Sequence, residues 1–152
     1  MKEGKLQIYC GNGKGKTTAA IGQAIREASK GRSVFIVQFL KGKQEEEISF
    51  IKRLEPEIKL FRFQKREEAF ENLTEQEKEE EIPNLKNGLN FARKVLATGE
   101  CDVLILDEVL GLPEREIATL EELHSLLEAA ENTDLIFTGI RLYPEMLEWA
   151  DE

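Results

Sequence analysis

The sequence predicts an α/β fold of three layers, with a mostly parallel sheet in the middle and helices on both faces. Short apolar runs alternate along the chain with longer segments of helical periodicity, as in successive strand–helix–strand units. Two runs, Ser33–Phe39 (SVFIVQF) and Asp102–Leu106 (DVLIL), are nearly continuous in apolar residues, which is typical of parallel strands buried on both faces. We therefore expect ligands at the carboxyl ends of the strands, where such sheets open a crevice.

The first part of the chain predicts a strand, a helix and a second strand in close succession. Lys5–Cys10 (KLQIYC) is a short apolar run that predicts a strand. A helix is expected from Gly15 to about Lys30, because Gly31 follows as a typical helix terminator. Ser33–Phe39 is rich in β-branched residues, which favour the extended conformation.

The middle of the chain predicts one more helix and strand, followed by a strongly acidic segment. Glu45–Leu54 is expected to be helical and to stop near Pro56. Ile58–Phe63 (IKLFRF) alternates apolar and basic residues, as a strand does. Gln64–Ile82 is expected to be a solvated helix face or a mobile loop, as runs of charge usually are.

The last part predicts three helices and two strands. A helix is expected from about Leu85 to Ala97, followed by the buried strand Asp102–Leu106. Thr119–Ala130 carries its leucines on one stripe, as an amphipathic helix does. Leu135–Thr138 (LIFT) is a fifth strand, and Pro144–Ala150 starts a last helix.

Length and composition fit one domain spanning residues 1–152. The chain is 41% hydrophobic, which is enough for a sizeable core, and its net charge is −9. So acidic a chain is a poor general nucleic-acid binder, because phosphate neutralisation needs clustered Lys and Arg. We therefore expect no nucleic-acid partner.

A reduced cytoplasmic setting is the expected location. The first residues lead into an apolar strand without a secretory signal region, and the apolar runs are far shorter than a membrane span. Cys10, Cys101 and His124 are too few and too badly spaced for a zinc site. Cys101 is expected to be a small buried hydrophobe, and no membrane partner is expected.

The stretch YCGNGKGKTTAA (residues 9–20) predicts a phosphate-binding loop between the first strand and the first helix. Helix N-termini offer unpaired N–H groups to anions, and the glycines let the backbone amides curl into an anion nest. Lys16 would neutralise phosphate oxygens, the Thr17 hydroxyl would ligate Mg²⁺, and Lys14 adds a second positive charge. The alternative is an ordinary glycine-rich turn, but the strand before and the helix after it favour the phosphate loop.

The loop departs from the usual Gly-x-x-x-x-Gly-Lys-[Ser/Thr] pattern at its first glycine, which is Cys10 here. That position can be the last residue of the strand, where negative φ suits a non-glycine residue. The departure therefore does not break the phosphate-loop prediction.

Three further segments follow predicted strands and are candidates for the same site. Leu104–Glu108 ends in two acids, of which we favour Asp107 as the Mg²⁺ ligand, while Glu108 would polarise water or help to hold the metal. Gln38–Gly42 is either a phosphate-contacting turn around Lys41 or a solvated turn. Arg141, in Thr138–Arg141, could reach a triphosphate or be a surface arginine.

These four segments, in this order, resemble the P-loop type ATP:corrinoid adenosyltransferases (cob(I)alamin adenosyltransferases). The loop of that family reads Thr-Gly-Asn-Gly-Lys-Gly-Lys-Thr-Thr, so that Cys10 replaces only its first residue. The resemblance spans nearly the whole chain and implies a three-layer P-loop (RecA-like) fold. It continues through Ala19-Ala20, Gly22, Arg26, Gln38–Gly42, Leu104–Glu108, Thr138-Gly139 and Glu148–Asp151.

The resemblance implies transfer of the 5′-deoxyadenosyl group of ATP to the cobalt of a reduced corrinoid, with release of triphosphate. ATP would lie in the reverse sense to ordinary P-loop enzymes, so that the ribose C5′ is exposed. Because Co(I) is the nucleophile, no side-chain nucleophile is needed. The resemblance also implies Mg²⁺ and a homodimer, and a flavoprotein is a candidate reductant.

The roles of single residues follow from the same resemblance. Lys16 and Lys41 would neutralise the triphosphate, and Thr17, Asp107 and Glu108 would serve Mg²⁺. Arg26 is a candidate nucleotide contact. Phe63 and Phe70 are candidates for an apolar corrinoid face, although Phe63 also fits a strand core. The triphosphate cradle corresponds to Asn12, Gly13, Lys14, Gly15, Lys16, Thr17 and Thr18.

Three departures from the family pattern bear on corrinoid binding and on the sheet. Ile140 stands where the family has Arg after Thr-Gly, and the usually glycine-rich segment is Gln64–Glu68 here. The family continues into another short strand, whereas this sequence stops at Glu152; we expect a sheet without that last edge strand, or a shortened chain. The alternative functions are an ATP-binding homologue without corrinoid activity and a generic P-loop phosphotransferase or ATPase.

Overall fold

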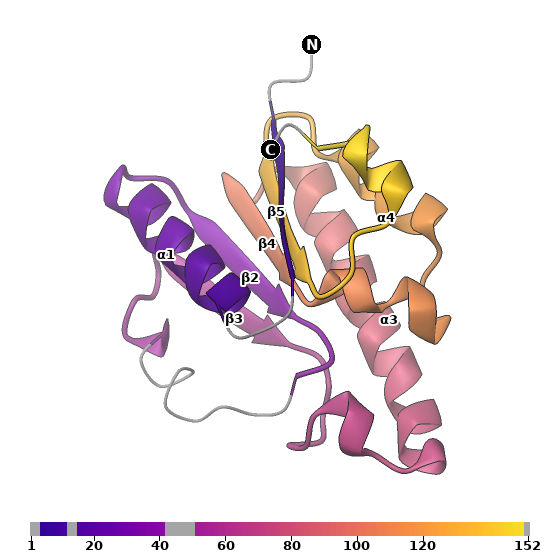
Figure 1. Cartoon of the computed structure of the whole chain (residues 1–152). Helices are drawn as coiled ribbons and strands as arrows, with labels where there is room; N and C mark the ends of the chain where they lie inside the picture. The colour runs from indigo at the N-terminus through magenta and orange to yellow at the C-terminus, as the bar shows by residue number, and fades with distance from the viewer. Residues whose placement is uncertain (1–3, 12–14, 42–50, 151–152) are drawn as a thin grey trace.

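The computed structural model describes residues 4–11, 15–41 and 51–150. Within these residues, five strands form one sheet, and all neighbouring strands pair in parallel. The sheet order is β1-β5-β4-β2-β3 (Figure 1). The strands are β1 (Leu6–Cys10), β2 (Val34–Gln38), β3 (Ile58–Arg62), β4 (Val103–Asp107) and β5 (Asp134–Gly139). The predicted parallel α/β sheet is therefore confirmed, with all five strands close to the expected positions.

One face of the sheet is covered by α1 (Gly15–Ser29). Ala20 and Ala24 are the buried residues of this helix, and their small side chains let it lie close to the strands. They pack in a cluster with alternate residues of the strands, namely Val34, Ile36, Ile58, Val103, Ile105 and Ile136, and with Ile51.

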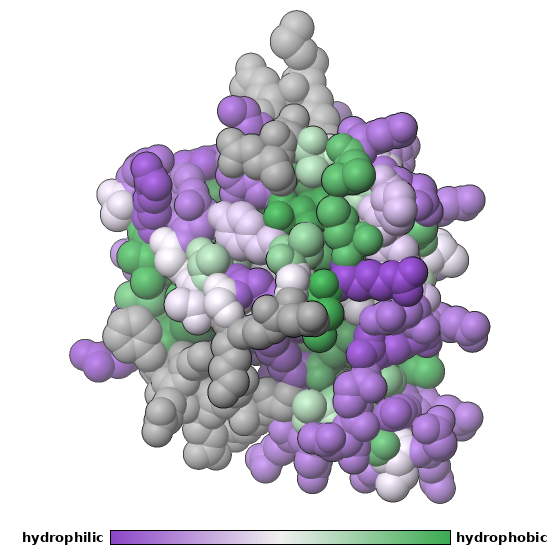
Figure 2. All heavy atoms as spheres, viewed as in Figure 1, coloured by the Kyte–Doolittle hydropathy of each residue, from purple (hydrophilic) through white to green (hydrophobic). Residues whose placement is uncertain are grey.

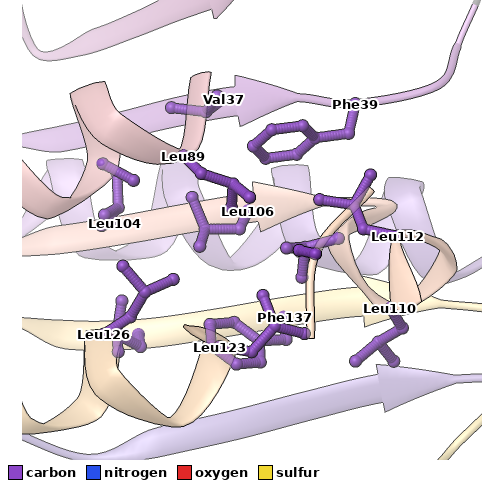
Figure 3. Packing of buried hydrophobic residues seen from close by; sticks show 14 of the residues in the cluster. Val37, Phe39, Leu89, Leu104, Leu106, Leu110, Leu112, Leu123, Leu126 and Phe137 are labelled. Carbon is purple, nitrogen blue, oxygen red and sulfur yellow. The ribbon is translucent and has the colours of Figure 1, made fainter. Parts of the chain in front are cut away.

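The other face of the sheet is covered by α3 (Glu75–Thr98) and α4 (Leu120–Ala129) (Figure 1). Figure 3 shows Leu104, Leu106 and Phe137 of the sheet beside Leu89 of α3 and Leu123 and Leu126 of α4. Because consecutive strand residues point to opposite faces, β4 and β5 contribute to both clusters. The expected three layers, with helices on both faces, are thus present.

The acidic middle of the chain forms the first turns of α3, which begins at Glu75 and not near Leu85. The helix alternative expected for this segment is therefore confirmed over residues 75–82, and the expected start of the following helix is wrong. Thr74 caps the helix: its side chain accepts from the backbone N–H of Glu77, and Glu77 bonds back to the Thr74 N–H. This capping box starts the helix within the charged segment, and Gly99 in the left-handed conformation ends it. Pro83 lies inside the helix, where its side chain faces solvent.

Two other expected helices have different outcomes. Most of Glu45–Leu54 lies outside the described residues. The helix expected at Pro144–Ala150 is wrong in type, because Pro144–Leu147 forms a short 3₁₀ helix. The connections on either side of α3 and β4 hold further 3₁₀ turns, at Phe70–Asn72, Val109–Gly111 and Pro113–Arg115.

The surface agrees with the acidic, highly charged composition. Hydrophilic side chains gather over the α3 side of the molecule in Figure 2. No helix in the described part of the chain is long and apolar enough to cross a membrane. Cys101 is 4% exposed, and burial raises the pKa of its thiol to about 12, so that the expected small buried hydrophobe is confirmed.

Candidate nucleotide and metal site

The carboxyl ends of β1, β5, β4 and β2 bring the predicted site residues to one edge of the sheet. Cys10 of β1 is in register with Gly139 of β5, and the Gly11 N–H donates to the Gly139 carbonyl at 3.2 Å. Gln38 of β2 is in register with Asp107 of β4. Gly11, at the start of the predicted phosphate loop, and the acidic pair therefore lie on either side of the end of β5.

Asp107 is the centre of the site and is almost fully buried, at 2% exposed. Its Oδ1 atom accepts from Thr138 Oγ1 at 2.6 Å and from Thr17 Oγ1 at 3.2 Å. Its Oδ2 atom accepts from Gln38 Nε2 at 3.3 Å and pairs with Lys41 Nζ at 2.8 Å. A buried carboxylate is stable only when paired and hydrogen-bonded, and these four partners meet that requirement from four different elements or turns.

Lys41 reaches Asp107 from a tight turn at the end of β2. The Lys41 N–H donates to the Phe39 carbonyl at 2.8 Å across Leu40, whose φ is 65°. Such a turn is rare and strained for a non-glycine residue. It is held by Arg62, whose Nη2 donates to the Lys41 carbonyl at 3.0 Å, and by the Phe70 N–H, which donates to the Leu40 carbonyl at 2.9 Å.

Lys16 and Glu108 form the second ion pair of the site, with 3.2 Å between Lys16 Nζ and Glu108 Oε1. Glu108 adopts the left-handed conformation, with φ of 64°, which turns the chain sharply after β4. Its N–H donates to Thr138 Oγ1 at 2.8 Å. Thr138 therefore bonds both acids, and the two side chains leave β4 toward different lysines.

The donor set fits Mg²⁺. Thr17 Oγ1 of α1 and the Asp107 carboxylate of β4 are hard oxygen ligands. One cation, the Lys41 ammonium, contacts both of these side chains. Within the described residues there is no group of three or more His, Cys, Asp or Glu that could hold a metal. Mg²⁺ sites of nucleotide enzymes use one or two carboxylates together with substrate phosphates, so a sparse protein set is what such a site needs.

Other predicted site residues are placed less centrally. Gly15 and Thr18 lie in the first turn of α1, with exposed surfaces. Arg26 is exposed in the last part of α1, roughly 15 Å along the helix from Lys16. Asn12, Gly13 and Lys14 lie outside the described residues. The nucleotide contacts expected of all these residues stay predictions.

The two phenylalanines expected at a corrinoid face lie in the core cluster or against it. Phe70 is 4% exposed and has Lys78 Nζ above its ring at 5.7 Å. The partly buried Phe63 packs against Phe91, with ring centroids 5.4 Å apart. Phe63 follows the last residue of β3, Arg62, and packs against the core without being fully buried. The Phe70 ring offers little surface to a ligand in this conformation.

Sequence reasoning named several of the supporting residues without their contacts. The sequence leaves the Gln38–Gly42 turn as either phosphate-contacting or solvated, and the structure shows the Gln38 amide donating to Asp107. The sequence gives Thr138 as part of the family pattern beside Arg141, but it does not indicate the bonds of Thr138 to the acidic pair or the bond of Arg62 to the Lys41 turn. One sequence signal could have found these supporting residues, namely a polar residue at the end of a buried apolar strand. Gln38, Asp107 and Thr138 all lie in the last two positions of a strand. Arg141 is 62% exposed in its side chain and stacks over Tyr143 at 5.0 Å.

Comparison with known families identifies the family of the chain. A family model described as "ATP:corrinoid adenosyltransferase BtuR/CobO/CobP" matches residues 2–152. The chain belongs to this family. The resemblance stated from the loop, the acidic pair and the turn after β2 is thereby confirmed, and the protein is a transferase of the ATP:corrinoid adenosyltransferase class.

Curated relatives agree with the family model over nearly the full chain. The corrinoid adenosyltransferase of Escherichia coli (strain K12) is 32% identical over 151 residues, which cover 99% of this chain and 74% of the relative. Corrinoid adenosyltransferase CobA of Salmonella typhimurium is 30% identical over the same length, with the same coverage of both chains.

A solved structure supports the fold alone. The KaiC-like protein PH0186 from Pyrococcus horikoshii OT3 superposes with a TM-score of 0.57 and 17% sequence identity. The match covers 92% of this adenosyltransferase-family chain but 64% of that protein, which is less than two thirds of its length. At 17% identity, the structural similarity supports the α/β fold and does not support any activity.

Proposed function

We propose that the protein transfers the 5′-deoxyadenosyl group of Mg²⁺-bound ATP to the Co(I) centre of a reduced corrinoid such as cob(I)alamin, releasing triphosphate. The observation that carries the proposal is the site around Asp107, where two lysines, two acids and a helix N-terminus meet at the phosphate loop. Family membership supplies the two substrate classes, ATP and a corrinoid.

The chemistry needs a nucleophile that the protein does not have to provide. Co(I) attacks the ribose C5′ carbon, the C5′–O bond breaks, and its electron pair leaves with the triphosphate. His124 lies on α4 beside Trp149, with ring centroids 4.9 Å apart, and pairs with Glu128, so it activates no serine or cysteine at the loop. The work left to the protein is positioning and charge neutralisation.

The charge neutralisation falls to Lys16 and Lys41. Negative charge grows on the triphosphate as the C5′–O bond breaks, and a lysine ammonium close to the phosphates stabilises that charge more in the transition state than in the ground state. Thr17 and Asp107 would hold Mg²⁺, with Glu108 beside them, and bound Mg²⁺ would neutralise phosphate oxygens. The Asp107 hydrogen bonds fix the carboxylate in place before substrate arrives.

The decisive experiment combines ATP, Mg²⁺ and chemically reduced cob(I)alamin with the purified protein. Formation of the Co–carbon bond is followed by absorbance, and the released phosphate species is identified by anion-exchange chromatography. We expect adenosylcobalamin and triphosphate in equal amounts. ADP as the product would instead indicate a phosphotransferase or ATPase.

A second candidate function is ATP binding without corrinoid activity, and the segment after β3 favours it. Gln64 is 2% exposed and donates to the Glu68 carbonyl at 2.7 Å, while the Lys65 N–H donates to buried Glu81 at 3.0 Å. The segment Gln64–Glu68 is therefore bonded to α3. In the family pattern the same segment is glycine-rich. ATP binding without cobalamin binding or product would select this function.

The remaining expectations concern the setting of the reaction. We propose a homodimer, a cytoplasmic location and a separate reductant, for which a flavoprotein is a candidate. Sedimentation velocity at micromolar concentration tests the dimer directly. A single species at the 17.4 kDa monomer mass would rule it out under those conditions.

A further inference from the structure

The Lys41 ammonium contacts the two side chains that the proposed function assigns to the metal ion. Its Nζ atom lies 2.8 Å from Asp107 Oδ2 and donates to Thr17 Oγ1. These are the two oxygens that the proposed function assigns to Mg²⁺. The Asp107 side chain is 2% exposed and the Lys41 side chain is 18% exposed, so that solvent reaches the pair only partly, from the lysine side.

The backbone of Lys41 is fixed while its side chain can turn. The Lys41 N–H is bonded to Phe39 and its carbonyl to Arg62, and the Phe39 N–H donates to the Asp107 carbonyl at 2.9 Å. These bonds hold the base of the side chain beside β4. The four rotatable bonds of lysine then allow the ammonium to leave Asp107 without any change in the turn.

The other lysine of the site is held in the same way. Lys16 Nζ pairs with Glu108 Oε1 at 3.2 Å, and both side chains are largely buried. Each acid of the site is thus neutralised by a lysine that the proposed function aims at the triphosphate. Binding of a metal and a triphosphate must exchange these partners.

We propose that Lys41 is a tethered substitute for the metal ion, which leaves Asp107 for a phosphate oxygen when Mg²⁺ and a triphosphate bind together. This proposal rests on the metal site of the proposed function. A divalent ion that binds alone must displace the Lys41 ammonium from Asp107, and the ammonium then gains no new partner. The divalent ion alone therefore binds weakly. A triphosphate supplies that partner, so metal and triphosphate bind cooperatively, with a coupling that each ligand exerts on the other.

The test measures Mn²⁺ binding without nucleotide, by the electron paramagnetic resonance signal of free Mn²⁺. Lys41→Met removes the ammonium and keeps the length of the side chain. We expect it to bind Mn²⁺ about tenfold more tightly than wild type, the size of one charge-assisted hydrogen bond. Lys41→Arg keeps a cation and should bind Mn²⁺ as weakly as wild type.

The matched control is Lys59→Met, which removes a lysine of β3 that lies over Phe35 at 5.9 Å, outside the site. It should leave Mn²⁺ affinity unchanged. Lys41→Gln repeats the measurement with a neutral polar side chain, in case the methionine variant does not fold as judged by circular dichroism. Unchanged Mn²⁺ affinity in a folded, neutral Lys41 variant overturns the proposal.

Asp107→Asn separates this proposal from the proposed function on which it rests. If Asp107→Asn lowers Mn²⁺ binding in the presence of ATP but the neutral Lys41 variants do not bind Mn²⁺ more tightly, the metal site stands and the substitution by Lys41 is wrong. If Asp107→Asn has no effect on Mn²⁺ binding with ATP, the assignment of Asp107 to the metal is wrong and the proposal for Lys41 falls with it, while adenosyl transfer is still decided by the reaction products.

Discussion

Thr138 is the side chain that ties the two acids of the site to β5. It is fully buried, donates to Asp107 Oδ1 at 2.6 Å and accepts from the Glu108 N–H at 2.8 Å. Thr138→Val keeps the shape and removes both bonds, leaving a backbone N–H and a carboxylate oxygen short of partners. We expect a loss of about 1–3 kcal/mol in the free energy of unfolding, measured by urea titration, and weaker Mg²⁺-ATP binding.

Thr133→Val is the matched control for that substitution. Thr133 is 4% exposed and donates to the Cys101 carbonyl at 3.1 Å, next to the start of β5 at Asp134 and away from the site. It should lower stability by a similar amount and leave Mg²⁺-ATP affinity unchanged. Equal nucleotide affinity in the two variants would contradict a role for Thr138 in the site.

Lys16 is the residue on which nucleotide affinity should depend most. Lys16→Ala removes the charge aimed at the phosphates, and we expect at least about a tenfold loss of ATP affinity by isothermal titration calorimetry. Lys30→Ala is the control, since Lys30 lies just beyond α1 with its side chain 56% exposed. Nearly unchanged ATP affinity in Lys16→Ala would count against the loop as the nucleotide site.

The sequence predicted the chemical residues of the site better than their contacts. The spacing of Lys16 and Thr17 and the pair Asp107-Glu108 follow from local patterns, which a sequence displays directly. The contact between Lys41 and Asp107 depends on β2 and β4 being neighbours in register, which is a property of the sheet. The left-handed conformations of Leu40 and Glu108 also carry no mark in the sequence, because neither residue favours positive φ.

At the scale of elements, the apolar strands were predictable and the start of α3 was not. Strands buried on both faces are short and apolar, so their limits follow from composition. For α3, the charge run before Leu85 fitted both a helix face and a loop, and the capping pair Thr74 and Glu77, which starts the helix, is the local signal that separates the two. Pro83 destabilises the helix by the hydrogen bond it cannot make, but its side chain faces solvent. The packing of the opposite side of α3 on the sheet stabilises the helix by more than this loss.

Thr74→Ala tests how much the cap of α3 matters. The substitution leaves the Glu77 N–H without its side-chain partner, and we expect a loss of about 1 kcal/mol in the free energy of unfolding by urea titration. Thr98→Ala, at the other end of the helix, is the comparison. The Thr98 hydroxyl donates to the Lys94 and Val95 carbonyls, which also accept backbone N–H groups of the helix end, so its removal should lower the free energy of unfolding less. A larger loss for Thr98→Ala would contradict the importance of the cap.

Arg32 joins the end of α1 to the start of β5, and this connection should respond to acid. Its Nη1 donates to Glu27 Oε2 at 2.8 Å, and its Nη2 lies 3.0 Å from Asp134 Oδ2. The hydrogen bond from Arg32 holds the pKa of Glu27 below its usual 4.5. A lowered carboxyl pKa stabilises the folded state above pH 4.5, and that contribution is lost as pH falls through the folded pKa.

Glu27→Gln should therefore lower the free energy of unfolding at pH 7, by at most about 1 kcal/mol, and the difference from wild type should shrink at pH 3. Urea titrations at the two pH values measure this. Glu79→Gln, at an exposed position of α3, serves as the control and should show no such change with pH. A difference for Glu27→Gln that grows as pH falls would reverse the expected sign.

At the scale of the whole molecule, the site depends on the order of the strands in the sheet, which differs from their order along the chain. β5 lies between β1 and β4, so the loop after β1 and the acids after β4 meet only when the last strand has paired on both sides. Sequence patterns predict parallel strands and the edge at which ligands bind. They do not give this order, because it is set by non-local pairing and packing.

Because the site is assembled from β1, β2, β4 and β5, a ligand that binds there should stabilise the entire fold. Mg²⁺-ATP at 100 times its Kd should add about 2.7 kcal/mol, which for a chain of this size is a rise of roughly 5–10 °C in Tm. Differential scanning calorimetry of wild type, Lys16→Ala and Lys30→Ala at one Mg²⁺-ATP concentration makes the comparison. Wild type and Lys30→Ala should shift equally, and Lys16→Ala should shift far less. An equal rise in all three would mean that ATP stabilises the protein from a surface other than the loop, and the assignment of the sheet edge as the nucleotide site would then fail.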